Sequence, residues 1–441
     1  MKELRPGDEF TTPPAYLTVC RGDIDDLCAR LTGMQKHPLA GLPQGERDLP
    51  VIFNEWCTTW GDPCHTNMEK LADTLKGWPV RYLVMDSGWF KGKEHEWFEM
   101  GGDWIPSKEK YPDGLKVTCD MVREHGFIPG IWFEFETCGL LSAAFAADEH
   151  LIRRFGKTLV VNNRKFWDFR DPWTWDYLCR RVIGLMKECG IGYIKVDSND
   201  TMGIGGDGAE SLGETLRQNI VCVNEFFHEM RRQIPELVIE NCSSGGHRLT
   251  ADFMEVSSLC SFSDAFETED IPIIAANLQR VIQPCQSGIW CIVRKKDDAK
   301  RLHYSLASIF LGRAILSGDV HDLSVRQKEI VLEGLSYYEK AKPVIGNGFS
   351  RRYGPCIPNY REPDGWQAVV RTSRDERSIL IVAHCFRSPM PICVEIPLPD
   401  GVYDCDWSYK TGSVDYELAN GKLLVAFKEE KEGAVMMLKK Q

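Results

Sequence analysis

Short apolar runs rich in β-branched and aromatic residues alternate with amphipathic stretches from about residue 49 to residue 342. A short apolar run bounded by turn residues predicts a buried strand, whereas apolar positions three or four apart predict a helix. The predicted strands cover 49–56, 81–89, 127–136, 193–199, 236–244, 257–265, 288–295 and 313–320. The predicted helices cover 65–77, 114–125, 172–190, 213–233 and 323–342. Eight strands with helices between them are typical of a TIM barrel.

The pattern changes after Pro343, where Gly346, Gly348 and Gly354 mark a break. Strand-like runs separated by turns then cover 366–372, 377–386, 392–398, 401–408 and 433–440. Closely spaced short strands predict an antiparallel β-sandwich. We therefore expect an α/β chain in three parts, namely a lead-in segment over 1–45, a (β/α)8 barrel over 46–343 and a C-terminal β-sandwich over 344–441.

Composition narrows the possible functions. The 441 residues carry a net charge of −11, which argues against a protein that binds nucleic acid. No apolar run is long enough to span a membrane, and the N-terminal residues are polar, so we expect neither a membrane protein nor a secretory signal. The 17 cysteines form no CxxC pair, and no HExxH motif occurs, which predicts reduced thiols in a cytoplasmic protein without a metal site.

Carboxylates at the ends of predicted strands are the first candidates for chemistry, because barrel enzymes catalyse at the carboxyl ends of their strands. Asp197 lies two residues after Lys195, so both side chains point to the same face of their strand. A nearby cation would keep Asp197 ionised, as a nucleophile must be. The alternative is a structural ion pair at the end of a strand.

Asp264, at the end of the predicted strand 257–265, is the candidate general acid and base. Its neighbours Phe262 and Phe266 would desolvate the carboxyl and raise its pKa, as an acid at neutral pH requires. The alternative is an N-cap on the following turn.

The 13 tryptophans point either to a large core or to sugar rings stacked on aromatic faces. Four of them fall near the predicted mouth of the barrel and favour the second interpretation: Trp56, Trp89, Trp104 and Trp132. Gly203, Gly205 and Gly208 spell GxGxxG but do not directly follow a strand, so we expect a flexible active-site loop and no bound cofactor.

Eight segments occur together in one order: FNEW (53–56), LVMDSGWF (83–90), GGDWIPSKEKYPDGLK (101–116), GIWFEFE (130–136), WDFRDP (167–172), IKVDSN (194–199), ENCSSGG (240–246) and SFSD (261–264). On these segments the chain resembles glycoside hydrolase family 36, the melibiase-type α-galactosidases. The resemblance implies a retaining double displacement on terminal α-galactosyl groups, with Asp197 as nucleophile and Asp264 as acid and base.

The same resemblance, with the polar residues at the strand ends, predicts a substrate-binding set. Its members are Trp56, Asp86, Ser87, Trp132, Arg164, Lys195, Asn199, Cys242 and Ser243. The implied partner is a small oligosaccharide or glycoside. Relatives carry a large N-terminal β-sandwich, of which 7–27 resembles only the end, so we expect a short form. A neighbouring subunit of a homo-oligomer could replace the loop that this domain supplies.

Three departures from the family pattern leave alternatives open. Ser87 stands where the family has a second aspartate, Val196 where it has a tryptophan, and AFETED follows Asp264. The same site could therefore belong to an α-N-acetylgalactosaminidase, a β-L-arabinopyranosidase or a transgalactosidase. The alternative outside catalysis is a decayed barrel that only binds sugar.

Overall fold

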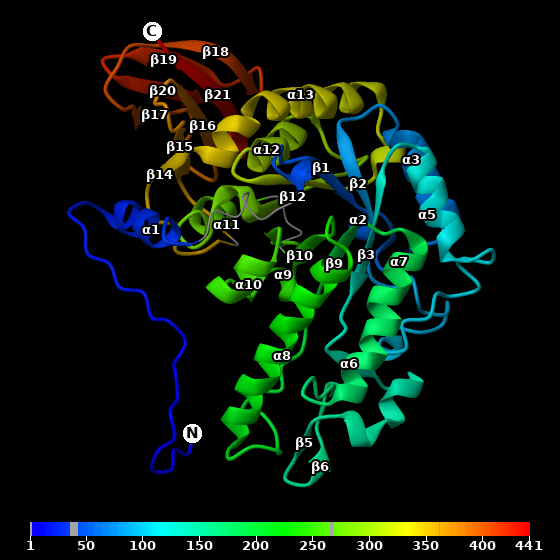
Figure 1. Cartoon of the computed structure of the whole chain (residues 1–441). Coiled ribbons are helices and arrows are strands. Elements are labelled where there is room, and N and C mark those ends of the chain that lie inside the picture. The colour runs from blue at the N-terminus through cyan, green and yellow to red at the C-terminus, as the bar shows by residue number, and fades with distance from the viewer. Residues whose placement is uncertain (1, 36–42, 265–268, 361) are drawn as a thin grey trace. The chain divides into compact units, whose positions relative to one another are not determined.

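The computed structural model describes residues 2–35, 43–264, 269–360 and 362–441 (Figure 1). Eight parallel strands of the described chain close into a barrel in the order β1-β13-β12-β11-β10-β9-β3-β2. They are β1 (Val51–Asn54), β2 (Val80–Met85), β3 (Ile128–Phe133), β9 (Tyr193–Val196), β10 (Val238–Asn241), β11 (Leu259–Ser261), β12 (Ser287–Val293) and β13 (Arg313–Gly318). Each strand lies at a predicted one, so the predicted TIM barrel is confirmed.

Internal contacts divide the chain into two compact units. The first unit comprises Met1–Leu17, Thr59–Ala72 and Leu83–Ser257. The second unit comprises Thr18–Thr58, Asp73–Tyr82 and Ser258–Gln441. The two units are described in turn below.

In the first unit, β9 pairs with both β3 and β10. Lys195 on β9 lies in register with Trp132 on β3 and with Glu240 on β10. Side chains alternate along a strand, so Tyr193, Lys195 and then Asp197 point to one face. The Tyr193 hydroxyl donates to Glu240 Oε2 at 2.5 Å, which joins the two strands through this face.

The predicted helices 114–125, 172–190 and 213–233 are observed in the first unit, whereas its helices at 97–100, 243–246 and 251–256 were not predicted. The helices of this unit are α4 (Trp97–Met100), α5 (Leu115–Glu124), α6 (Pro172–Leu178), α7 (Leu185–Cys189), α8 (Leu212–Gln233), α9 (Ser243–Gly246) and α10 (Ala251–Val256), while α3 (His65–Leu75) spans residues of both units. A π-helical turn (Cys179–Gly184) joins α6 to α7, so the predicted helix 172–190 is nearly continuous. Asp171 begins it by accepting from Trp173 N, and Gly190 ends it at a φ of +62°.

A small antiparallel sheet follows β3 in the first unit. Its strands are β4 (Thr137–Gly139), β7 (Val160–Val161) and β8 (Arg164–Phe166), in the order β4-β8-β7. A two-stranded ribbon of β5 (Arg153–Arg154) and β6 (Lys157–Thr158) lies between β4 and β7 in the sequence. The sheet matters for the site because β8 carries Arg164.

The second unit contains two antiparallel sheets. The five-stranded sheet has the order β14-β15-β16-β21-β18 and the three-stranded sheet β17-β20-β19. Their strands are β14 (Phe349–Tyr353), β15 (Trp366–Thr372), β16 (Ser378–Cys385), β17 (Ile392–Pro397), β18 (Tyr403–Lys410), β19 (Asp415–Ala419), β20 (Lys422–Phe427) and β21 (Glu432–Lys440). Ile381, Val394, Val425 and Met436 belong to one buried core drawn from both sheets, so the predicted β-sandwich is confirmed.

The second unit also corrects several expectations. Its helices are α1 (Ile24–Thr32), α2 (Trp56–Thr59), α11 (Ile271–Leu278), α12 (Ala299–Ile309) and α13 (Val325–Asn347). The predicted end of the last helix at residue 342 is wrong, because α13 continues through Pro343 to Asn347. Helices α1, α2, α11 and α12 and strands β14, β19 and β20 were not predicted. None of the described helices is both long and apolar enough to cross a membrane.

Candidate active site

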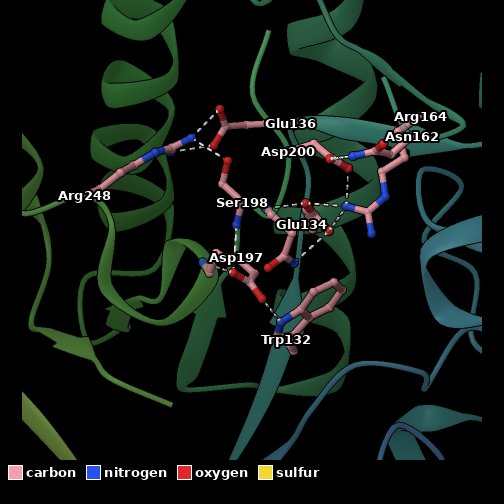
Figure 2. Close-up of polar contacts among 11 residues, drawn as sticks. Trp132, Glu134, Glu136, Asn162, Arg164, Asp197, Ser198, Asp200 and Arg248 are labelled. Atoms are coloured by element: carbon pink, nitrogen blue, oxygen red, sulfur yellow. Dashed lines mark hydrogen bonds and ion pairs between the residues drawn. The ribbon is translucent and has the colours of Figure 1, made fainter. Parts of the chain in front are cut away.

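Asp197 directly follows β9, and three N–H groups hold its carboxylate (Figure 2). The main-chain N–H groups of Ser244 and Ser198 donate to Oδ1 at 2.7 and 2.9 Å. The indole Nε1 of Trp132 donates to Oδ2 at 3.2 Å. Hydrogen bonds from donors of this kind stabilise the ionised carboxylate. The arrangement therefore fixes the orientation of the Asp197 carboxyl group at the carboxyl end of a barrel strand.

Lys195 lies on the same face of β9, but its ammonium pairs with Asp86. The Nζ atom is 2.8 Å from Asp86 Oδ2, and both side chains are buried. Burial acts to lower the pKa of Lys195, but Asp86, Cys242 and Glu240 together raise it well above the ordinary value. The alternative raised for Asp197 was a structural ion pair with Lys195, but the buried ion pair at this strand joins Lys195 to Asp86. Asp197 adds only a smaller upward effect on the pKa of Lys195.

Ser87 is buried beside this ion pair. Its main-chain N–H donates to Asp86 Oδ1 at 2.8 Å. Its hydroxyl oxygen is buried and has no hydrogen-bond partner within the described chain. A buried hydroxyl without a partner carries a desolvation cost, so Ser87 holds an unused donor and acceptor next to Asp86.

Glu134, one residue beyond β3, is the centre of a buried polar network (Figure 2). Arg164 Nη1 lies 2.7 and 2.8 Å from its two carboxylate oxygens. Asn199 donates to the same carboxylate from its main-chain N at 2.7 Å and from Nδ2 at 3.3 Å. Arg164 also contacts Asp200 Oδ2 at 3.2 Å, and Asn162 Nδ2 donates to Asp200 Oδ1 at 2.8 Å.

This network holds more acidic than basic side chains, because the single guanidinium of Arg164 contacts both the Glu134 and the Asp200 carboxyl groups. Burial raises the pKa of Glu134 to about 7, and Asp197 adds to the rise, whereas Arg164 and Asn199 oppose it. The close contacts to Arg164 favour the ionised form, so the net upward direction reflects full burial among several carboxylates.

A second ion pair joins Glu136 to Arg248 in an end-on fork. Arg248 Nη1 and Nη2 donate to the Glu136 oxygens at 2.6 and 2.9 Å. Nη2 also donates to Ser198 Oγ at 2.7 Å. Burial lowers and Glu136 raises the pKa of Arg248, with a net rise. The Glu136–Arg248 pair therefore reaches the residue next to Asp197.

The turn after β10 delivers both Ser244 and Arg248. Ser243 and Ser244 adopt left-handed backbone conformations with φ of +45° and +54°, which cost about 1–2 kcal/mol per non-glycine residue. Asn241 holds the turn by accepting from Ser243 Oγ at 3.1 Å and donating from Nδ2 to Arg248 O at 2.7 Å. Cys242 Sγ accepts from Gly245 N at 3.4 Å. Strained backbone of this kind is typical of functional sites.

A known protein family matches the part of the chain that carries these site residues. The family model described as Melibiase matches residues 9–281. This chain belongs to the melibiase family. The alpha-galactosidase AgaA of Geobacillus stearothermophilus is 25% identical over 252 residues, which are 56% of this chain and 34% of that protein. Alpha-galactosidase 1 of Pediococcus pentosaceus is 22% identical over 396 residues, 86% of this chain and 52% of that protein. The chain thus spans about a third to a half of the length of these melibiase relatives.

Solved structures show the same fold. A variant of the Geobacillus stearothermophilus enzyme AgaA, in complex with 1-deoxygalactonojirimycin, has a TM-score of 0.81 at 16% identity, over 95% of this chain and 59% of that one. The galactosidase domain of alpha-galactosidase-sucrose kinase AgaSK has a TM-score of 0.75 at 20% identity, over 89% of this chain and 54% of that one. At these identities the likeness concerns the fold of the melibiase family.

The first unit brings together most of the predicted site residues. Of these, Asp197, Trp132, Arg164 and Asn199 belong to the hydrogen-bonded set around the end of β9. Asp86, Ser87 and Lys195 form the neighbouring buried group. Cys242 and Ser243 shape the turn that donates to Asp197.

Three tryptophans near the predicted mouth are buried among aromatic neighbours in this structure, and a role for them in binding sugar stays a prediction. The relative exposure of Trp89, Trp104 and Trp132 is 0%, 2% and 1%. Trp89 stacks with Trp104 at 6.2 Å between ring centroids, and Trp89 Nε1 donates to Trp132 O at 2.8 Å. The void lined by Trp104, Trp132 and Arg164 is only about 10 Å³, which is about the space for one water molecule.

Two predicted site residues belong to the second unit. Trp56 begins α2 and donates from its main-chain N to Asn54 Oδ1 at 2.8 Å. Asp264 lies three residues after β11, is exposed, and accepts from Ser263 Oγ at 2.8 Å. Although the neighbouring Phe262 is buried, Asp264 itself is exposed, so the predicted burial of the Asp264 carboxyl is not observed. Phe266 lies outside the described residues.

The alternative of an N-cap on the turn after Asp264 falls on 265–268, which lie outside the described residues, and the N-cap of α11 is Asp270. The sequence did not single out Arg248 or the roles of Glu134 and Glu136. Glu136 and Arg248 are separated by 112 residues, so no local pattern links them. The one available signal was the position of both glutamates at the carboxyl end of the predicted barrel strand 127–136.

Proposed function

We propose that this protein is a retaining exo-acting glycoside hydrolase that releases terminal α-galactosyl or closely related groups. The carboxylate of Asp197, held by three N–H donors at the end of β9, is the observation that carries the proposal. Support comes from the melibiase family model and from relatives named alpha-galactosidases. Solved AgaA variants contain raffinose and stachyose, which suits a substrate of this class.

In the proposed first step, Asp197 attacks the anomeric carbon while the glycosidic C–O bond breaks. Asp264 gives its proton to the departing oxygen, and a covalent glycosyl-enzyme forms. Oδ1 of Asp197 accepts two main-chain N–H groups, whereas Oδ2 accepts only the longer bond from Trp132. Oδ2 therefore retains the more available lone pair and is the proposed attacking atom.

In the second step, water attacks the anomeric carbon, Asp264 takes a proton from it, and Asp197 leaves as the carboxylate. Asp86, Ser87 and Lys195 are proposed to bind ring hydroxyls, since all three present polar groups close to the carboxyl ends of β2 and β9. Trp56, Trp132, Arg164, Asn199, Cys242 and Ser243 remain proposed substrate contacts or supports.

The test is turnover of aryl α-galactoside by the wild type, Asp197→Asn and Asp264→Asn, with the anomeric configuration of the product followed by NMR. We expect Asp197→Asn to lower kcat by about 10⁴-fold or more, because the amide is a poor nucleophile. We expect Asp264→Asn to impair substrates with poor leaving groups most. A product of inverted configuration, or full activity in Asp197→Asn, would contradict the proposal.

Ser87 favours a second candidate within the same chemistry. A neutral, buried hydroxyl replaces a carboxylate that the family places beside Asp86, and Oγ has no described partner. The sugar could therefore be an α-N-acetylgalactosaminide or a β-L-arabinopyranoside, or a second sugar could replace water as acceptor. A panel of these aryl glycosides, with and without added raffinose, separates the candidates by relative kcat/KM and by transfer products. If no glycoside is turned over but sugars bind, a catalytically decayed binding protein is the better description.

A further inference from the structure

Two ion pairs flank the three residues that follow Asp197 (Figure 2). Glu134 with Arg164 lies on one side, and Glu136 with Arg248 on the other. The side chains of the first pair are 4% and 7% exposed, and those of the second pair 13% and 23%. Charges with this little exposure are weakly screened by solvent, so both pairs hold their geometry firmly.

Each of the three residues after Asp197 contacts one of these pairs. Ser198 Oγ accepts from Arg248 Nη2 at 2.7 Å, and Asn199 N donates to Glu134 Oε1 at 2.7 Å. Asp200 Oδ2 lies 3.2 Å from Arg164 Nη1. The segment 198–200 is thus held through three successive residues.

Arg248 is itself anchored by the turn that binds Asp197. Asn241 Nδ2 donates to Arg248 O at 2.7 Å, and the same turn places Ser244 N at 2.7 Å from Asp197 Oδ1. The second donor to that oxygen is Ser198 N at 2.9 Å. The two N–H groups on Oδ1 therefore come from two segments, and Arg248 connects these segments through Ser198 Oγ.

We propose that Glu136 and Arg248 are positioning residues for Asp197. By holding Ser198, the pair keeps both main-chain N–H groups on Oδ1 and so directs Oδ2 toward the reacting carbon. This inference rests on the proposed nucleophilic role of Asp197. It differs from a purely structural salt bridge because its effect on turnover must pass through the Asp197 carboxylate.

The test combines Arg248→Lys with azide rescue of Asp197→Ala. Lysine keeps the charge but cannot form the fork to Glu136 while also donating to Ser198. In the rescue, azide attacks the anomeric carbon of an aryl α-galactoside. A C–N bond forms, the C–O bond to the aryl group breaks, and the aryl group leaves as the phenolate. The rescued reaction does not use the Asp197 carboxylate.

We expect Arg248→Lys alone to lower kcat by about 10–100-fold, with KM changed by less than about threefold, because misplacing a reacting group costs rate. Added to Asp197→Ala, the same change should leave the azide-rescued rate unaltered. Equal losses in both backgrounds, or no loss in either, would overturn the positioning role. Full activity of Asp197→Ala would instead overturn the proposed function, and the positioning role with it.

Two further variants keep the test decisive. Arg170→Lys is the matched control, because Arg170 makes a similar partly exposed fork to Asp168, with bonds of 2.8 and 2.7 Å, away from Asp197. If Arg248→Lys does not fold, Ser198→Ala removes the acceptor of Arg248 and leaves the pair to Glu136 in place. Its kcat should then fall about threefold or more, again only where Asp197 is present.

Discussion

Glu134 has an unusual position for a carboxylate, because it is buried and shares its arginine with a second acid. Burial raises the pKa of Glu134 to about 7, against an ordinary value of 4.5. A carboxyl whose pKa is higher in the folded chain than in the unfolded chain binds its proton more tightly when folded. Glu134 therefore destabilises the ionised folded protein, and this cost appears as the pH rises.

We predict that the Glu134 carboxyl lowers the free energy of unfolding as the pH rises from 4.5 to about 7, because the carboxyl loses its proton at a lower pH in the unfolded chain than in the folded chain. Above that window both states are ionised and the effect is constant. In the wild type this effect should lower the free energy of unfolding by about 2–3 kcal/mol, and Glu134→Gln should abolish that pH-dependent loss. Urea unfolding at about pH 5 and about pH 8 measures it.

The control for this measurement is Glu124→Gln, because Glu124 has an exposed side chain at the end of α5. The wild type and the control should lose stability in parallel over this range. If Glu134→Gln follows them as well, Glu134 ionises in the folded chain as it does in the unfolded chain.

At the scale of elements, α13 shows how side chains define a helix start. Ser324 accepts from Gln327 N at 3.3 Å, and the Gln327 side chain accepts from Ser324 N at 2.8 Å. Such a capping box satisfies two N–H groups that have no partner inside the helix. The box supports a helix of 23 residues, which packs Ile330, Leu335 and Tyr338 into the core.

Ser324→Ala should therefore destabilise the protein by about 1 kcal/mol, because it removes the cap acceptor. Ser336→Ala in the same helix is the control. Ser336 is exposed, and its hydroxyl donates to Glu333 O in the same helix, so the change should be neutral or slightly stabilising. Thermal unfolding midpoints compare the two variants, and equal midpoints would show that the cap contributes nothing measurable.

The sequence predicted the barrel strands well, but it extended several of them beyond their real ends. The predicted strands 127–136 and 236–244 end at Phe133 and Asn241. The residues beyond are aromatic or polar in a pattern that continues the strand, yet they form the site. In the turn after Asn241, the left-handed backbone of Ser243 and Ser244 is not favoured by serine and could not be read from residue type.

Helix α12 was missed for a different reason. Seven of its 11 residues are buried, so the polar face that reveals a helix from periodicity is short. Within the candidate site, Asp197 and Lys195 were recognisable because they share one strand. The pairing of Arg248 with Glu136 was not, because it depends on two turns distant in the sequence.

At the scale of the whole chain, a buried ion pair joins the segment before β1 to β13. Arg313 Nη1 lies 2.6 Å from Glu46 Oε2, and both side chains are 0% exposed. Tyr82 donates to the other Glu46 oxygen at 2.6 Å. A buried pair adds little over an apolar replacement, but removing one partner leaves an uncompensated charge.

Arg313→Met should therefore lower the free energy of unfolding by about 3–5 kcal/mol. Adding Glu46→Gln should recover part of that loss, because the remaining buried charge is neutralised. Denaturant titration of both variants measures the effect. A double variant less stable than Arg313→Met would show that Glu46 contributes through Tyr82 more than through Arg313.

The pairing of β1 with β13 also has a consequence during synthesis. Ile52 lies in register with Ile315, so one edge of β1 finds its neighbour only after 263 further residues have been made (from 52 to 315). At about 5–20 residues per second, the interval is about 13–50 s. During that time a short, largely apolar strand edge is exposed on the nascent chain. Ribosome-associated chaperones that shield such edges should therefore raise the yield of folded protein, and faster translation of this stretch should reduce aggregation.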